Sequence, residues 1–348
     1  MRVAQVAPLF ESVPPQRYGG TERVVSYLTE ELVRRGHEVT LFASGDSRTR
    51  ATLVPVVERA TRLDASSQDL CTADAVRQLD VVAARADDFD VIHWHVDSLA
   101  FPFSHLLRTP GVHTLHGRLD LPHLQSLFRH FNDVPLVSIS DAQRRPLDGL
   151  GLRWAATVYH GQPLARYPFR AESEGYLAFL GRCSPEKQLD IAIEVAKRVG
   201  LPLRIAAKID HKDRAYFDRV IAPLLDDPLI EFHGEIGDEG KAAFLGGALA
   251  LLFPIDWPEP FGLVMVEAMA CGTPVVARPC GAVPEVVVDG RTGFIGSELV
   301  ELVEAVKRID EIDRAACRRH AEERFSVERM TEDYEAVYGR LAARRQAA

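Results

Sequence analysis

The chain has 348 residues, of which 47% are hydrophobic and 26% charged, and its formal net charge is −9. At roughly 100–200 residues per domain this length predicts two domains, and so apolar a composition excludes disorder over most of the chain. The acidic balance argues against nonspecific nucleic-acid binding, which needs a basic surface.

Cysteine usage and targeting signals favour a reducing compartment. The five cysteines form no C-x-x-C pair, and their odd number argues against a disulfide framework or a cysteine zinc site. We find no run of about 18 uncharged apolar residues that could cross a membrane. The opening Met1–Pro8 is too short and polar for a signal-peptide core. We therefore expect a cytoplasmic protein without a membrane span.

Strand patterns alternate with helix patterns along the first half of the chain. Thr21–Arg35 carries apolar residues at helical spacing, and Gly36 favours a helix end directly after it. The predicted strands are Arg2–Ala7, Val39–Ala43, Val91–Val96, Gly111–Leu115, Leu136–Ile139 and Thr157–Tyr159. Such alternation is typical of βαβ units around a parallel sheet.

The alternation pauses at His160–Gly175, where glycines and prolines break any period and predict an inter-domain linker. It resumes with a helix predicted over Pro185–Val199, and Leu299–Ala343 reads as a helical, charged tail. The predicted strands of this half are Tyr176–Leu180, Leu203–Ala207, Leu229–Phe232, Ala248–Phe253 and Thr273–Ala277. The chain is therefore expected to hold two α/β units in series.

The strongest local signal is a strand, a Pro-rich loop and a helix between Trp257 and Ala277. Glu259 lies in the loop, and Glu267 lies about two turns inside a helix predicted to start near Phe261. Ligands of open α/β sheets bind beyond the carboxyl ends of strands, where this loop lies. The N–H groups that can hold an anion at such a helix start belong to Phe261, Gly262, Leu263 and Val264. Taken alone, two glutamates are more often solvated than functional, so the segment needs support from other motifs.

A second strand, turn and helix start carries two cations. Arg182 and Lys187 flank the turn, with Ser184 as a candidate N-cap and Pro185 at the first helical position. An arginine fork together with a lysine point charge suits a diphosphate. The alternative is a pair of surface cations with Glu186 as their partner.

Two weaker signals lie in the first half. Gly19 and Gly20, in the loop Tyr18–Glu22, would let the backbone approach a ligand closely before a helix. His116 follows a predicted strand, where it could hydrogen-bond a hydroxyl or transfer a proton. A structural role is the commoner one for a single histidine.

Two metal-like patterns do not fit their places in the predicted sheet. Asp88-Phe89-Asp90 precedes a strand, which is the wrong end of a parallel sheet for a site. His93 and His95 lie on one side of a strand, but no third ligand is identifiable, so a place in the core or along an acceptor cleft is the better interpretation.

Together these motifs give the chain a resemblance to the retaining glycosyltransferases of family 4, over nearly its whole length. The resemblance is carried by the Gly-Gly loop, by F-L-G-R-x-S-P-E-K at 179–187 and by the Glu-x7-Glu spacing from Glu259 to Glu267. It extends to Gly272–Ala277, to the turn Asp289–Phe294 and to the helix start at Phe325-Ser326.

The resemblance implies the GT-B fold, in which two Rossmann-like, doubly wound parallel-sheet α/β domains face each other across a cleft. It implies an acceptor-side domain over 1–162, a nucleotide-sugar donor domain over 163–325, and a last helix, 326–348, that returns to the first domain. The family often has Asn-Gly where the linker begins, and this chain has His160-Gly161 instead. Contacts of the family at that point are therefore not carried over.

The resemblance also implies roles for the candidate residues. Arg182 and Lys187 would contact the donor diphosphate, and Glu267 would accept hydrogen bonds from the ribose. Glu259 and the backbone at 261–263 would hold the transferred sugar. His116 would contact that sugar from the first domain, and Gly19 and Gly20 would approach the diphosphate.

The expected reaction is transfer of a hexose, with retention, from a UDP- or GDP-linked sugar to a hydroxyl of a sugar, lipid-linked or small-molecule acceptor. The resemblance implies no essential metal and no other cofactor, because the two cations would take that role. Two alternatives remain open: a GT-B nucleotide-sugar epimerase, and a sugar-nucleotide-binding subunit without turnover. The sequence names neither the sugar nor the acceptor.

Overall fold

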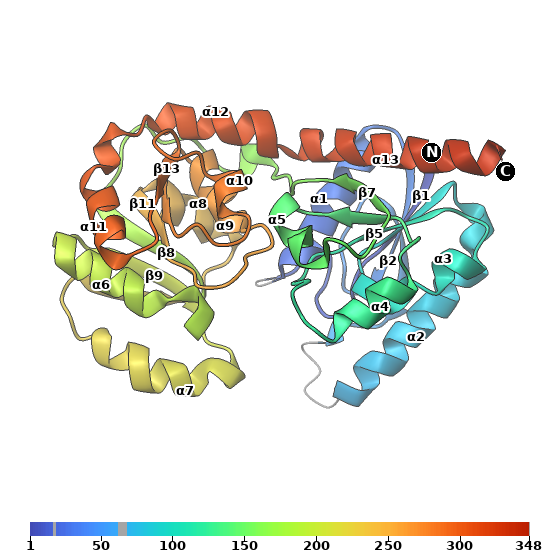
Figure 1. The fold of residues 1–348 in the computed structure, drawn as a ribbon, viewed down its shortest axis with the longest axis horizontal. Coiled ribbons are helices and arrows are strands. Elements are labelled where there is room, and N and C mark those ends of the chain that lie inside the picture. Colours follow the sequence, from blue (N-terminus) through green and yellow to red (C-terminus); the bar gives the residue numbers. More distant parts are fainter. Residues whose placement is uncertain (17–18, 62–67, 348) are drawn as a thin grey trace. The chain divides into compact units, whose positions relative to one another are not determined.

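A computed structural model describes residues 1–16, 19–61 and 68–347, without the side chains of 68–71 and 344–347. The chain divides into two compact units, and each is an α/β structure around one parallel sheet (Figure 1). Unit 1 comprises Met1–Gly161 together with Val327–Ala348, and unit 2 comprises Gln162–Ser326. The predicted fold class is confirmed.

The sheet of unit 1 has seven parallel strands in the order β3-β2-β1-β4-β5-β6-β7. They are β1 (Arg2–Val6), β2 (Glu38–Ser44), β3 (Thr52–Val57), β4 (Val91–Trp94), β5 (Gly111–Thr114), β6 (Leu136–Ser138) and β7 (Trp154–Thr157). The helices are α1 (Gly20–Arg34), α2 (Gln68–Ala84), α3 (Phe103–Leu106), α4 (Leu124–His130), α5 (Asp141–Arg144) and α13 (Val327–Ala347). The order reverses between β1 and β4, so this unit has its switch point there.

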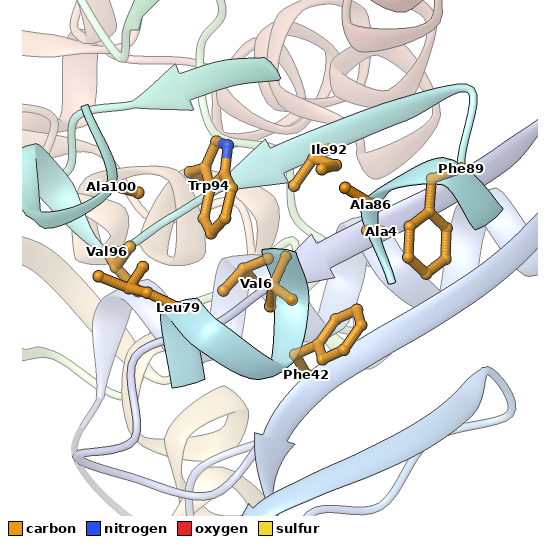
Figure 2. Packing of buried hydrophobic residues seen from close by; sticks show 11 residues of the cluster. Ala4, Val6, Phe42, Leu79, Ala86, Phe89, Ile92, Trp94, Val96 and Ala100 are labelled. Carbon is orange, nitrogen blue, oxygen red and sulfur yellow. The ribbon is translucent and has the colours of Figure 1, made fainter. Parts of the chain in front are cut away.

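Side-chain alternation divides the central strands of unit 1 into an apolar and a polar side. Figure 2 shows the apolar side, where Val6 of β1 and Ile92 and Trp94 of β4 belong to one buried cluster with Leu79 of α2. Intervening residues of the same strands face the other way, because side chains alternate across a strand. That second side is covered by α13, which packs on both β4 and α1 (Figure 1).

Unit 2 repeats the arrangement with six parallel strands in the order β10-β9-β8-β11-β12-β13. They are β8 (Tyr176–Arg182), β9 (Leu203–Lys208), β10 (Ile230–Gly234), β11 (Ala248–Phe253), β12 (Val275–Ala277) and β13 (Gly293–Ile295). The helices are α6 (Leu189–Val199), α7 (Arg214–Tyr216), α8 (Asp238–Gly246), α9 (Leu263–Ala270), α10 (Val283–Val286), α11 (Leu299–Lys307) and α12 (Arg314–Phe325). One group of helices pairs α6 with α11, and the other packs α9 against α8 and α12.

Several predicted boundaries were wrong. The helix expected over Pro185–Val199 is split, because Gln188 has a left-handed backbone with φ of 53° between a short 3₁₀ turn and α6. Ser184 makes no side-chain capping hydrogen bond there. The strand expected at Thr157–Tyr159 lies earlier, as β7, and β3 and β13 were not predicted.

The chain passes from unit 1 to unit 2 at Gly161 and returns at Val327. In unit 2 the two crossing segments are joined, because Gln162 forms a parallel bridge with Ser326 and its N–H donates to the Phe325 carbonyl over 2.8 Å. Most of the predicted linker, residues 162–175, therefore belongs to unit 2. His160, at its start, is buried in unit 1. Within the described residues we find no helix long and apolar enough to cross a membrane.

Candidate active site

The candidate site of unit 2 lies at the carboxyl ends of β8 and β11, the two central strands where the strand order reverses. Parallel α/β sheets bind ligands at such a switch point. The loop 183–188 follows β8 and the loop 254–262 follows β11. They touch directly, since the Asp256 N–H donates to the carbonyl of Glu186 over 2.9 Å. Both strong sequence motifs therefore meet at one edge of one sheet.

Lys187 and Glu259 form the centre of this meeting point. The Nζ of Lys187 lies 2.5 Å from Oε2 of Glu259, and the side chains are only 15% and 11% exposed. Nε1 of Trp257 donates to the same carboxylate oxygen over 3.0 Å, and the ammonium lies 4.6 Å from the centre of its ring. Lys187 is thus held by a carboxylate and an aromatic face, both from the loop 254–262.

Arg182 ends β8 and is held by acids as well. It pairs with Glu186 in the following turn, and its Nε lies 3.6 Å from Oδ2 of the buried Asp213. The expected cations are therefore neighbours along one loop, each with its own carboxylate. Burial raises the pKa of the intervening Cys183 thiol to about 12, so this cysteine is not a nucleophile at neutral pH.

The helix behind Glu259 begins later than predicted. Leu263 is its first residue, and Gly262 caps it with φ of 84°. Leu263 and Val264 therefore supply the N–H groups of the first turn, whereas Phe261 and Gly262 precede it. The Phe261 side chain is buried, with its ring centre 5.8 Å from that of Phe325.

A third loop, which follows β12, fixes the backbone of Glu259. The N–H of Ala282 donates to the Glu259 carbonyl over 2.9 Å. Gly281 has φ of 58°, and a Cβ there would lie 2.3 Å from the backbone N and O of Glu259. Only glycine fits this contact, so it sets how closely the two loops approach.

Glu267 has a different environment from Glu259. It lies one turn into α9 and is buried, and its Oε1 accepts from Nζ of Lys241 over 2.9 Å and from the Tyr167 hydroxyl over 3.1 Å. No described residue donates to its Oε2. The two glutamates therefore have separate partners, and one oxygen of Glu267 is left for another donor.

Sequence reasoning missed Arg278, which directly follows β12. Its N–H donates to the carbonyl of Phe253, and its Nη1 lies 3.4 Å from Oε1 of Gln188. Among the described residues no carboxylate lies within ion-pair distance of this guanidinium. The feature of the sequence that could have identified Arg278 is its position directly after the predicted strand Thr273–Ala277.

The candidates of unit 1 lie at the corresponding edge of the other sheet. Gly20 begins α1, and Gly19 before it has φ of 148°. A Cβ on Gly19 would lie 2.8 Å from Cβ of Pro15, so the loop turns tightly there. Tyr18, from the same motif, is outside the described residues.

His116 follows β5 and is tied to the interior of unit 1. Its Nε2 lies 2.9 Å from Nδ1 of His95, and its ring stacks on His160 with centres 5.3 Å apart. Burial lowers the pKa of His116 to about 3. The ring is therefore neutral at physiological pH, which favours hydrogen bonding over acid catalysis.

The two metal-like patterns are structural. Asp90 accepts from the backbone and the guanidinium of Arg2 at the amino end of the sheet, and Asp88 pairs with Arg85. His93 and His95 are buried in unit 1. Over residues 1–16, 19–61 and 68–347 we find no cluster of three His, Cys, Asp or Glu side chains arranged to hold a metal ion.

Two family profiles match almost the entire chain. Residues 166–324 match "Glycosyl transferases group 1", and residues 18–163 match "Glycosyltransferase Family 4". The chain is 28% identical to a phosphatidyl-myo-inositol mannosyltransferase of Mycobacterium tuberculosis (strain CDC 1551 / Oshkosh) over 328 residues, covering 85% of this chain and 82% of the relative.

Solved structures share the fold over the whole length. AviGT4, a glycosyltransferase involved in avilamycin A biosynthesis, aligns with a TM-score of 0.75 and 26% identity, covering 99% of this chain and 98% of its own. Anabaena HepE, solved with UDP and glucose, aligns with a TM-score of 0.76 and 18% identity, covering 98% and 100%. The chain belongs to the family 4 glycosyltransferases and has the GT-B fold. It is a sugar-transferring enzyme that acts on a sugar donor and an acceptor.

Proposed function

We propose that the enzyme transfers a hexose from a nucleoside-diphosphate sugar to an acceptor hydroxyl, with retention and without an essential metal ion. The observation that carries the proposal is the contact of Lys187 with Glu259 beside the start of α9, at the switch point of unit 2. This places a cation, a carboxylate and free N–H groups where a Rossmann-like sheet binds phosphates and sugars. The complex of HepE with UDP and glucose supports a nucleotide donor.

In this proposal unit 2 is the donor unit. Arg182 and Lys187 contact the diphosphate. The backbone at Gly19 and Gly20 of unit 1 is a further proposed contact of the diphosphate. The N–H groups of Leu263 and Val264 face the same negative charge, and the Oε2 of Glu267 accepts from ribose hydroxyls. Glu259, through its carboxylate and the backbone at 261–263, binds the transferred sugar.

The chemical step breaks the bond between the anomeric carbon and the phosphate oxygen. The acceptor oxygen forms the new bond on the same face of the sugar, and the departing phosphate takes the acceptor proton. Negative charge grows on the phosphate as the bond breaks, and the preorganised Arg182 and Lys187 stabilise it. Because these cations supply the positive charge, we expect no requirement for Mg²⁺.

Donor binding is measured first, by thermal unfolding with UDP, GDP and ADP, each with EDTA and with Mg²⁺. A ligand at about 100 times its dissociation constant adds roughly 2.7 kcal/mol to stability. A stabilisation by one nucleotide that survives EDTA supports the donor site. A stabilisation that requires Mg²⁺ contradicts metal independence.

Product analysis then tests the reaction with sugars linked to that nucleotide. A glycosylated acceptor with the anomeric configuration of the donor supports retaining transfer, and an inverted product contradicts it. An epimerised donor would identify an epimerase. Binding without any product would identify a subunit without turnover.

A further inference from the structure

Seven polar side chains form one continuous hydrogen-bonded chain inside unit 1. They lie on the side of the sheet covered by α13 and are all buried except His116, which is partly exposed. In order the chain runs through Tyr334, Thr114, His93, Tyr338, Gln5, His95 and His116. It ends at His116, one of the candidate site residues of this unit.

The Gln5 amide sets the direction of the hydrogen bonds. Its Nε2 donates to the Tyr338 hydroxyl over 3.0 Å, which leaves its Oε1 as the acceptor toward Nε2 of His95 at 2.8 Å. His95 must therefore carry its proton on Nε2. Burial keeps this ring neutral by lowering its pKa well below the ordinary value, so its Nδ1 is a bare acceptor.

The next bond passes this constraint to His116. Its Nε2 lies 2.9 Å from the bare Nδ1 of His95 and must be the donor. A neutral ring carries only one N–H, so Nδ1 of His116 is unprotonated. That nitrogen has no hydrogen-bond partner among the described residues. A buried acceptor without a partner is uncommon in folded proteins and calls for a donor from elsewhere.

The bonds that run from Gln5 toward Thr114 fit the same orientation of the Gln5 amide. Tyr338 accepts from Gln5 and donates to Nδ1 of His93 over 2.7 Å, and Nε2 of His93 then donates to Thr114 over 2.7 Å. Gln5, Tyr338 and His93 thus each act as donor in one bond of this chain and as acceptor in another. Aligned bonds of this kind polarise one another in a low-dielectric interior and hold one arrangement.

We propose that Gln5 and His95 are positioning residues that hold His116 as its Nε2–H tautomer and present its Nδ1 as an acceptor to a substrate hydroxyl. The second half of this statement rests on the proposed function, in which His116 contacts the transferred sugar. The first half concerns the protein alone. Helix α13 takes part through Tyr338, so a segment of the chain far from the motif contributes to its chemistry.

The tautomer is measured directly, by long-range ¹H–¹⁵N NMR of the full chain labelled at histidine. The signals of His116 are assigned by their loss in His116→Gln. We expect Nδ1 to resonate as an unprotonated nitrogen and Nε2 as a protonated one. A proton on Nδ1 would mean that the hydrogen bonds run in the opposite direction, and it would overturn the proposal.

Substitution of Gln5 tests the cause. Gln5→Met removes both bonds of the amide, so we expect His95 and His116 to exchange between tautomers. Gln5→Glu still accepts from His95 and should restore the wild-type pattern for His116. Val6→Ala, on the opposite face of the same strand, controls for loss of stability and should leave the tautomer unchanged. An unchanged His116 spectrum in Gln5→Met contradicts the positioning role.

Kinetics test the contact with substrate. Loss of one oriented hydrogen bond predicts that Gln5→Met lowers kcat/KM for the sugar donor by about fivefold to tenfold. Affinity for UDP, which lacks the transferred hexose, should stay at the wild-type value. A changed tautomer with unchanged kcat/KM overturns the contact with a substrate hydroxyl. If no nucleotide sugar is turned over by the wild type, the proposed function fails, and the NMR result still decides the positioning role.

Discussion

At the scale of single residues, unit 2 balances its buried charges in pairs. Lys187 pairs with Glu259, and Lys241 pairs with Glu267. The pairs differ in exposure: the carboxylate of Glu267 is only 3% exposed, whereas both side chains of the first pair are partly accessible. A pair at a loop whose carboxylate is partly accessible can exchange that carboxylate for a diphosphate at modest cost, but a pair with a fully buried carboxylate is fixed in place.

We therefore expect Lys187→Ala to reduce catalysis far more than stability. Loss of one preorganised positive group should lower kcat by about 10²–10³-fold. Lys197→Ala is the matched control, because Lys197 also pairs with a carboxylate, Asp227 at 3.1 Å, on a more exposed part of the same unit. Steady-state kinetics and urea unfolding of both variants decide the matter. Equal kcat in the two would argue against a diphosphate contact.

For the pair of Lys241 with Glu267, in contrast, we expect a large effect on stability. Lys241→Met removes the cation and leaves a buried carboxylate with only the Tyr167 hydroxyl, so the free energy of unfolding should fall by about 3 kcal/mol. The double variant Lys241→Met/Glu267→Leu removes both charges and should recover most of this loss. Urea unfolding of the single and double variants measures the coupling. A double variant less stable than Lys241→Met would contradict it.

At the scale of elements, two glycines near β13 test steric and conformational effects separately. A Cβ on Gly293 would lie 1.9 Å from the Val275 carbonyl of the neighbouring strand, whereas a Cβ on Gly290, with φ of 71°, would meet nothing within 4 Å. We expect Gly293→Ala to cost more than about 2 kcal/mol through backbone displacement. Gly290→Ala should cost about 1 kcal/mol, for its left-handed conformation alone. Thermal unfolding compares the two, and equal losses would show that β13 adjusts to the extra carbon.

The same elements show why the fold was largely predictable. Buried strands of parallel sheets are largely apolar runs, and β8 and β11 stand out as such in the sequence. The strand β3 is only partly buried at an edge of its sheet and contains Pro55, so its pattern is weak. The strand β13 is only three residues long and begins with a glycine, so it has no strand pattern of its own. It forms because it pairs with β12.

The candidate site was predictable in part. Arg182, Lys187, Glu259 and Glu267 were identified because their spacing around strand ends resembles a known family. Their partners could not be identified, since Trp257 and Lys241 act through contacts that no local pattern encodes. The break at Gln188 was missed for the same reason: Pro185 favours a helix start, and the left-handed turn that follows depends on the meeting of two loops.

At the scale of the whole molecule, the chain is threaded so that its last helix completes its first unit. Helix α13 supplies Tyr334 and Tyr338 to the polar side of the sheet that begins with β1. Charged pairs of α13 with the residues that follow α1, such as Arg35 with Glu335 at 2.9 Å, strengthen this contact. No periodicity in the tail predicts it, because the partners lie about as far apart in sequence as the chain allows.

The buried histidines of unit 1 make its stability depend on pH. Burial lowers the pKa of His113 and His116 to about 3 and those of His93, His95 and His160 well below the ordinary value. The unfolded chain takes up protons on these rings below about pH 6.5, and the folded unit does not. Stability from this source is therefore complete above that pH and is lost as the pH falls toward the folded pKa values.

We expect each neutral ring to contribute up to about 1.4 kcal/mol per pH unit to this loss, so that the urea midpoint falls steeply between about pH 7 and pH 5.5. His113→Leu should remove about one proton from the uptake on unfolding and so reduce the slope of the unfolding free energy against pH, because the ring is fully buried on the apolar side of the sheet. His105→Leu should leave the slope unchanged, since that side chain is 43% exposed rather than buried. A urea midpoint that stays constant over this range would show that the histidines take up protons within the folded unit, which would require water to enter beneath α13.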